Sequence, residues 1–137
     1  MTPTPPWPVT EPTPQPEEEP FYDGLLVGEL RVPWCDNCDE HVWRPKSHCT
    51  VCYRAVSGWR TLSGMGEVYS YCVIHRGVEA FAAIGPYVLA WVSLDGGPTI
   101  LGNVIAPQDD LRIGMRVRIV EPRDPERGQR GPVFTGC

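Results

Sequence analysis

The sequence lacks several features that would place it in a common functional class. No apolar run reaches the roughly 18 to 20 residues of a membrane-spanning helix, and the N-terminus does not resemble a signal peptide. Gly-rich phosphate loops and nucleophile elbows are missing as well. For a chain of 137 residues, we therefore expect a soluble, cytoplasmic protein with one domain and a small appendage, and binding rather than catalysis.

Positive charge is also scarce. The chain has a net charge of −5 and a sequence pI of about 5.1, whereas nucleic-acid-binding domains commonly have a pI above about 9. Residues 1–40 hold nine acids and one arginine, and residues 111–137 hold six arginines and three acids. This balance argues against a general nucleic-acid binder, and we interpret the acidic start as a solvated tail.

Four of the six cysteines form the most informative pattern in the chain. Two C-x-x-C pairs, Cys35 with Cys38 and Cys49 with Cys52, are separated by ten residues. Each pair can turn tightly and aim two sulfurs at one point, so that four thiolates surround one tetrahedral ion. Because such a set leaves no open coordination position, we predict a structural zinc ion there and no catalytic residue.

Other interpretations of the cysteines compete with zinc. A rubredoxin-like iron centre uses the same four thiolates, so iron is an alternative to zinc at this point. Paired disulfides, in contrast, fit the metal-ligand spacing poorly. His41 and His48 lie nearby, but four cysteines already complete the shell, so we expect both histidines outside it. We expect Cys72 to be a small buried core residue and Cys137 to be an exposed thiol.

The N-terminal stretch has its own composition. Residues 1–20 contain eight of the sixteen prolines, and such a segment cannot form an interior helix or strand. We assign residues 1–17 to a Pro-rich linker or a disordered tail. The linker interpretation would make this chain the C-terminal part of a longer protein.

The next region, residues 18–58, combines a short helix with the metal-binding ribbon. Phe21, Leu25 and Leu26 share one side of a helix predicted over residues 17–30. A helix this short must pack on the rest of its domain or on another chain. We expect Phe21 and Leu25 to contact a partner subunit.

Beyond residue 58 the hydrophobic period becomes two, which is typical of β-strands. An Asp-Gly-Gly-Pro sequence between two of the predicted strands is a strong hairpin signal. Five short strands with turns between them predict an OB-type barrel over residues 59–137. The fold class is thus mostly β, with a short N-terminal helix, a four-cysteine zinc ribbon and a five-stranded barrel. The predicted strands are 67–75, 87–94, 99–105, 115–120 and 132–135.

The order of these motifs resembles that of a known family. The helix and the ribbon are followed by "GEVYSYCVIHRGVEAFAAIGPYVLAWVSLDGG", "ILGNV" and "LRIGMRVRI". Over residues 18–135 this arrangement is similar to the zinc-ribbon OB-fold proteins first catalogued as domain of unknown function 35. The resemblance implies a non-catalytic partner of a thiolase-like enzyme that acts on coenzyme A thioesters.

The family suggests more specific expectations. In archaea its members bridge thiolase and hydroxymethylglutaryl-CoA synthase. In actinobacteria one such domain ends the enoyl-CoA hydratase subunit of the cholesterol side-chain pathway, after a hot-dog hydratase module, and partners a thiolase-like aldolase. The resemblance therefore implies a hetero-oligomer with a lipid-transfer-type, thiolase-like aldolase that cleaves a steroid side-chain CoA thioester. A hydratase module would precede the proline-rich segment, acyl-CoA would be met only indirectly, and neither membrane nor nucleic acid would be a partner.

Two sets of residues are candidates for contacts. Residues 76–86 form a long loop whose apolar Phe81 and Ile84 predict a contact with another subunit, unless the loop plugs the barrel mouth. A His75/Glu79 acid–base pair is a weaker interpretation. Four arginines could meet coenzyme A phosphates or an acidic partner surface: Arg76, Arg112, Arg116 and Arg118.

Two alternative functions stay open at this point. A single-stranded nucleic-acid-binding OB-fold would stack bases on Tyr69, Tyr71 or Trp91. The acidic pI argues against this function. An electron carrier would hold iron at the four cysteines.

Overall fold

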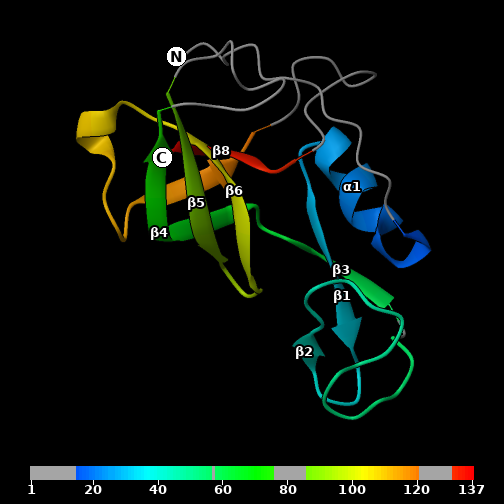
Figure 1. Cartoon of the computed structure of the whole chain (residues 1–137). Coiled ribbons are helices and arrows are strands. Elements are labelled where there is room, and N and C mark those ends of the chain that lie inside the picture. The colour runs from blue at the N-terminus through cyan, green and yellow to red at the C-terminus, as the bar shows by residue number, and fades with distance from the viewer. Residues whose placement is uncertain (1–14, 57, 76–85, 121–130) are drawn as a thin grey trace.

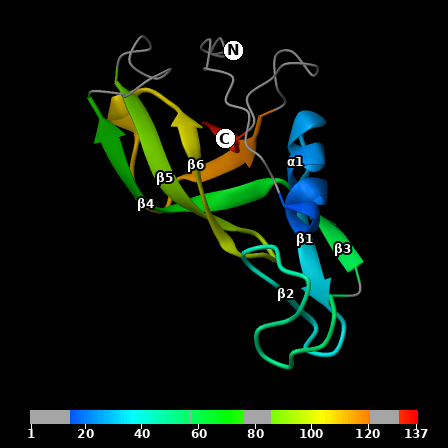
Figure 2. The same cartoon turned by 45° about the vertical axis from the view of Figure 1, so that its right-hand side comes forward.

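The computed structural model of the chain describes residues 15–56, 58–75, 86–120 and 131–137. Within these ranges a 3₁₀ turn, η1 (Pro16–Glu18), and a short helix lead into a three-stranded sheet, which is followed by a closed barrel (Figure 1). Figure 2 shows the ribbon extending away from the part formed by the helix and the barrel. The helices in the described ranges are all too short or too polar to cross a bilayer.

The helix α1 (Glu19–Leu26) is shorter than the helix predicted over residues 17–30. It ends where Gly28 adopts a φ of 73°, a left-handed conformation that glycine adopts without steric cost. The N–H of Glu29 then donates to the carbonyl of Gly24 at 2.9 Å, which is the hydrogen bond of a Schellman cap. The chain is thereby turned directly into its first strand.

The apolar side of α1 packs against the barrel of the same chain. Phe21 is 6% exposed and Leu25 is 4% exposed, and both belong to one core cluster with Val92 and Phe134 of the barrel. This corrects the expectation that Phe21 and Leu25 contact a partner subunit. The helix finds its packing surface within its own chain, so both side chains are core residues.

The ribbon is built on a small antiparallel sheet that the sequence did not predict. Its central strand is β1 (Leu30–Cys35), which pairs with β2 (Glu40–His41) on one side and with β3 (Gly58–Leu62) on the other. The registers run from Leu30 opposite Leu62 to Cys35 opposite Glu40. The predicted boundary between residues 58 and 59 falls within β3, and it stays a prediction.

Five of the described strands close into the barrel, which confirms the predicted fold class. Their order is β4-β5-β6-β8-β7, and β7 pairs with β4 to complete the ring. The pairing of β6 with β8 is parallel, whereas the other pairs are antiparallel. The barrel strands are β4 (Met65–Ile74), β5 (Tyr87–Leu94), β6 (Thr99–Ile105), β7 (Arg116–Ile119) and β8 (Val133–Gly136). A second 3₁₀ turn, η3 (Gln108–Asp110), lies between β6 and β7.

The hairpin between β5 and β6 forms at the predicted Asp-Gly-Gly-Pro sequence. The N–H of Leu94 donates to the carbonyl of Pro98 at 3.0 Å, and Gly96 has a φ of 72°. A left-handed residue at this position suits a glycine, because a side chain there would be strained. The second and third barrel strands have the predicted bounds.

A bulge in β4 changes which side chains face the barrel interior. The register shifts between Val68 and Ser70, and Cys72 then lies opposite Leu89. Cys72 is exposed, which corrects the expectation of a buried core cysteine. One extra residue in a strand reverses the alternation of the faces beyond it, and the sequence pattern gave no signal for that residue.

Candidate metal centre and surface sites

The structure brings the four predicted cysteines together in one cluster. The Sγ atoms of Cys35 and Cys52 are 3.6 Å apart, and those of Cys38 and Cys49 are 4.0 Å apart. All four sulfurs lie within 4.8 Å of one another. Thiolates at about 2.3 Å from a tetrahedral zinc ion are separated by about 3.8 Å. The cluster can therefore hold one metal ion with four sulfur ligands.

Backbone N–H groups at both cysteine pairs point at the sulfurs. The N–H of Cys38 donates to the Sγ of Cys35, and the N–H of Val51 donates to the Sγ of Cys49, each at 3.4 Å. Hydrogen bonds of this kind stabilise negative charge on a thiolate. The turn that aims each pair of sulfurs thus also prepares one of them to bind a cation.

The residue after the second cysteine of each pair has a left-handed backbone. Asp39 has a φ of 54° and Tyr53 a φ of 63°, although neither is a glycine. A side chain in this region costs on the order of 1 kcal/mol or more. The tight turns at the two cysteine pairs, here called the two knuckles, therefore share one backbone shape, which aspartate tolerates better than tyrosine does.

Hydrogen bonds to and among the thiols separate their pKa values. The backbone N–H of Arg54 is the main reason that the pKa of Cys52 falls to about 6. The hydrogen bond with the Cys52 thiol is the main reason that the pKa of Cys38 rises to about 12. Four adjacent thiols cannot all ionise by themselves, because the negative charges repel one another. A divalent cation would offset that repulsion.

Few apolar side chains support the ribbon around the cluster. Its buried core consists of Cys35, Val42 and Cys49, with Val56 packed against them. On the surface, the guanidinium of Arg60 lies 3.9 Å from the centre of the Trp34 ring. So small a core cannot hold two knuckles together without a further link, and the metal would be that link.

The two histidines of the ribbon lie outside the ligand set, as predicted. The metal-binding group found in the described ranges consists of the four cysteines. His48 is exposed, and its Nδ1 lies 3.1 Å from the hydroxyl of Ser47. His41 is partly buried and lies in β2 opposite Trp34.

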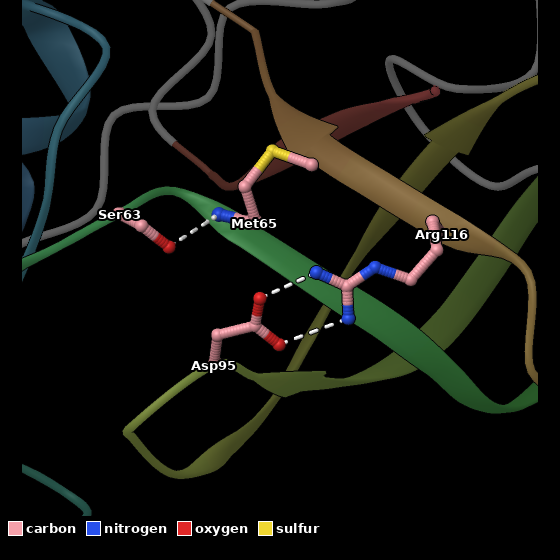
Figure 3. Close-up of polar contacts among 4 residues, drawn as sticks. All are labelled: Ser63, Met65, Asp95 and Arg116. Atoms are coloured by element: carbon pink, nitrogen blue, oxygen red, sulfur yellow. Dashed lines mark hydrogen bonds and ion pairs between the residues drawn. The ribbon is translucent and has the colours of Figure 1, made fainter.

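Arg116 is engaged within the chain. Its Nη1 donates to the Oδ1 of Asp95 at 2.9 Å, and its Nη2 donates to the Oδ2 of the same carboxylate (Figure 3). This bidentate pair joins β7 to the turn that follows β5, and it lowers the pKa of Asp95. The same view shows the N–H of Met65 donating to the hydroxyl of Ser63 at 3.3 Å, at the start of β4.

The other candidate arginines differ in their surroundings. Arg112 is exposed and donates to the carbonyl of Asp110 at 3.5 Å. Arg118 is exposed on β7 and makes no ion pair with a residue that the structure describes. Arg112 and Arg116 both line an open pocket of about 460 Å³, together with Met115 and Thr135. Their contact with coenzyme A or a partner stays a prediction.

Several predicted residues lie outside the described ranges, namely Arg76, Glu79, Phe81 and Ile84. The contact predicted for the apolar loop and the pairing of His75 with Glu79 therefore stay predictions. His75 itself is exposed at the end of β4.

The three aromatic residues considered for base stacking are all exposed: Tyr69 by 67%, Trp91 by 43% and Tyr71 by 38%. The hydroxyl of Tyr71 also donates to the carbonyl of Leu111 at 3.4 Å, so a hydrogen bond holds this ring in place. Base stacking on these rings stays a prediction.

A groove that the sequence did not reveal lies between the helix and the barrel. It has a volume of about 190 Å³, and its walls include Tyr22, Trp43, Trp91 and Leu101. These residues come from α1, from the loop after β2, and from β5 and β6, so no local pattern joins them. Only the packing of α1 on the barrel creates the groove.

Comparison with known proteins identifies the family. The family model of the ChsH2 C-terminal OB-fold domain matches residues 59–121. A DUF35 domain-containing scaffold protein of Methanocaldococcus jannaschii is 34% identical over 104 residues, which is 74% of each chain. This chain belongs to the DUF35 family. A second DUF35 scaffold protein, from Methanothermobacter thermautotrophicus, is 33% identical over 75 residues, covering 54% of this chain and 56% of its relative.

A solved structure shares the fold of this DUF35 chain. A chain described as part of the Ltp2–ChsH2(DUF35) aldolase superposes with a TM-score of 0.79 and 26% sequence identity. The match covers 92% of this chain and 98% of the other. The similarity therefore extends through both the ribbon and the barrel.

Proposed function

We propose that this DUF35 chain is a non-catalytic scaffold that binds and completes a thiolase-like aldolase in a hetero-oligomer. The observation that supports this most is the likeness to a chain of the Ltp2–ChsH2(DUF35) aldolase over nearly the whole length of both chains. The name of the curated relatives, DUF35 domain-containing scaffold proteins, points to the same role.

The chemistry of the metal cluster agrees with a supporting role. Four cysteine sulfurs around one ion fill a tetrahedral shell, so neither substrate nor water can bind the metal. We propose that the ion is zinc and that it holds the ribbon in shape. Metal analysis of the purified chain would test this, since zinc leaves the protein colourless and a four-thiolate iron site colours it red.

We further propose that the partner cleaves a steroid side-chain CoA thioester in a retro-aldol reaction. A hydratase module on the same parent chain would supply the hydroxyacyl-CoA that such a cleavage consumes. Arg76, Arg112 and Arg118 are the arginines that we assign to coenzyme A phosphates or to an acidic partner surface. Arg116 is a weaker candidate, because its guanidinium already binds Asp95.

The test of the scaffold function is a reconstitution. The DUF35 chain, a thiolase-like aldolase from the same host and their mixture are each assayed with a β-hydroxyacyl-CoA. We expect no turnover by the DUF35 chain alone and at least tenfold more by the mixture than by the aldolase alone. Turnover by the isolated chain, or an aldolase that neither binds it nor responds to it, would contradict the proposal.

The loop proposed for the interface can be tested in the same complex. Phe81→Asp together with Ile84→Asp should abolish co-purification with the aldolase while the metal content stays unchanged, because two charges would be buried without partners. The matched control is Phe81→Leu with Ile84→Val, which keeps the loop apolar and should keep the complex. A complex that survives both charged substitutions would place the interface elsewhere.

A further inference from the structure

The groove between α1 and the barrel has the composition of a site for an extended, proline-rich peptide. One wall consists of Trp91 and Leu101, which are cross-strand partners on the outer face of β5 and β6 and are 43% and 38% exposed. A second wall includes Tyr22 and Trp43. A groove lined by aromatic and aliphatic side chains is the kind of surface that polyproline II segments recognise.

The aromatic wall is held in place from beneath. The ring of Phe21, which is buried, makes edge contacts with both outer rings: its centroid is 5.3 Å from that of Tyr22 and 5.1 Å from that of Trp43. The partial burial of Tyr22 is the main reason that its pKa is raised. Because the walls are fixed, a ligand would lose little binding energy to ordering the site.

Gln15, the first residue that the structure describes, lies beside the groove. The N–H of Gln15 donates to the Oε1 of Glu18 at 3.1 Å, and Glu18 lines the groove. The segment that precedes Gln15 is therefore attached at the rim. Residues 1–14 contain six prolines, with Pro5, Pro6 and Pro8 around Trp7. Fourteen residues in a polyproline II conformation would span about 43 Å, more than such a groove requires.

Charge on the rim favours the same occupant. Arg44 is exposed on the groove wall and makes no ion pair with a residue that the structure describes. Glu11 is the one ionisable side chain among residues 1–14. Glu11, which lies among the prolines, can form an ion pair with Arg44 when residues 1–14 lie in the groove.

We propose that this groove binds the chain's own residues 1–14 as a polyproline II segment. The proposal does not depend on the scaffold function. Attachment at Gln15 makes the docking intramolecular, which gives the segment a high effective concentration at the groove. Docking would cover Trp91 and Leu101 and would fix the direction in which the chain leaves the domain on its N-terminal side.

NMR relaxation of the full ¹⁵N-labelled, metal-loaded chain tests the proposal. In the parent chain we expect the Trp7 indole and the amides of Thr10 and Glu11 to have order parameters above about 0.6, as ordered residues do. Trp91→Ala should lower all three below about 0.6, since the groove loses one wall. Leu101→Gln gives a second test of the same wall. Tyr69→Ala removes an exposed ring outside the groove and should leave the values unchanged.

Each other outcome overturns the proposal. Order parameters below about 0.6 in the parent chain would show that the segment is not docked. Values that stay high in both groove variants would show that it is docked elsewhere. Order that disappears on dilution would show that the segment lies in the groove of a second copy of the chain.

Discussion

The ribbon and the barrel reach a folded state by different means. The ribbon has a buried core of three residues, two of which are cysteines of the four-sulfur cluster. The core that spans the helix and the barrel is much larger and consists of apolar side chains from every barrel strand. In the barrel, burial of apolar surface provides the stability. In the ribbon, a metal ion held by the four cysteines would supply the stability that the small core cannot.

This difference indicates which change would destabilise each half of the molecule. Loss of the ion should unfold the ribbon around β1, β2 and the knuckles, yet leave the barrel closed. A cavity in the barrel should lower the stability of the domain and leave the metal ligands intact. The following predictions separate the two halves, starting with the largest effect.

The largest effect is expected from Cys49→Ser. A missing thiolate opens the tetrahedral shell, so the metal content should fall from one ion per chain to less than about a tenth of that. NMR signals of residues 35–56 should collapse into the unfolded range while barrel signals stay dispersed. Cys72→Ser is the matched control, because Cys72 is exposed outside the cluster. Collapse of barrel signals as well would show that the two halves depend on the same ion.

A smaller but still large effect is expected from Phe134→Ala. This side chain is completely buried between the barrel and the helix, and the truncation should cost about 3 to 5 kcal/mol of unfolding free energy. Urea unfolding followed by barrel signals measures it. The metal content under native conditions should not change. Thr99→Ala, at an exposed position on β6, should shift the unfolding midpoint little. A loss of metal from Phe134→Ala would show that the barrel supports the ribbon.

Tyr53→Gly should stabilise the ribbon by about 0.5 to 1 kcal/mol. The φ of 63° at Tyr53 is strained for a tyrosine and free for a glycine, and the side chain is largely exposed. Competition with a chelator should therefore remove the metal from the variant at a higher chelator concentration. Tyr53→Ala removes the ring but keeps the Cβ, and it should not show this gain. Equal behaviour of the two variants would mean that backbone strain does not limit metal retention.

The smallest effect is a pH dependence in the barrel. The hydrogen bonds from Arg116 lower the pKa of Asp95 in the folded state. The pair therefore stabilises the fold fully above the unfolded pKa of about 3.9, and this contribution is lost as the pH falls through the lower folded value.

Asp95→Asn measures this contribution. The variant should unfold at a slightly lower urea concentration than the parent at pH 6, and the difference should shrink below about pH 4. Unfolding is followed by the NMR signals of barrel residues, because protonation of the four cysteines at low pH would also affect the ribbon. Asp109→Asn, which removes an exposed acid, is the control. A difference that persists at pH 2 would show that the carboxylate charge is not its source.

Local patterns were enough to predict most of the barrel. The alternation of residues 87–94 and 99–105 and the Asp-Gly-Gly-Pro turn between them led to strands with the observed bounds. The cysteine spacing was enough to predict the ligand cluster, because two tight turns with the same spacing have one common way to combine. In both cases the information lies within a few neighbouring residues.

The sequence predictions were incomplete or wrong where the folded arrangement of the chain determines the local structure. The strand β1 contains Pro33, which disfavours a strand by local propensity, and it exists because β2 and β3 pair with its two edges. The length of α1 was overestimated, because a glycine that only weakens a helix locally forms a cap in the folded chain. The bulge at Val68 and Ser70, which leaves Cys72 exposed, depends on the curvature of the closed barrel.

By itself, the sequence determined which atoms could bind a metal and which segments would form strands, because ligand spacing and side-chain alternation are properties of a few adjacent residues. The tertiary structure alone decided that Phe21 and Leu25 belong to the core, that Arg116 binds Asp95, and that Trp43 and Trp91 face one groove. These arrangements join residues far apart in the chain. Their geometry is set only when the helix packs and the barrel closes, since the apolar surface that drives both steps has no preferred direction until then.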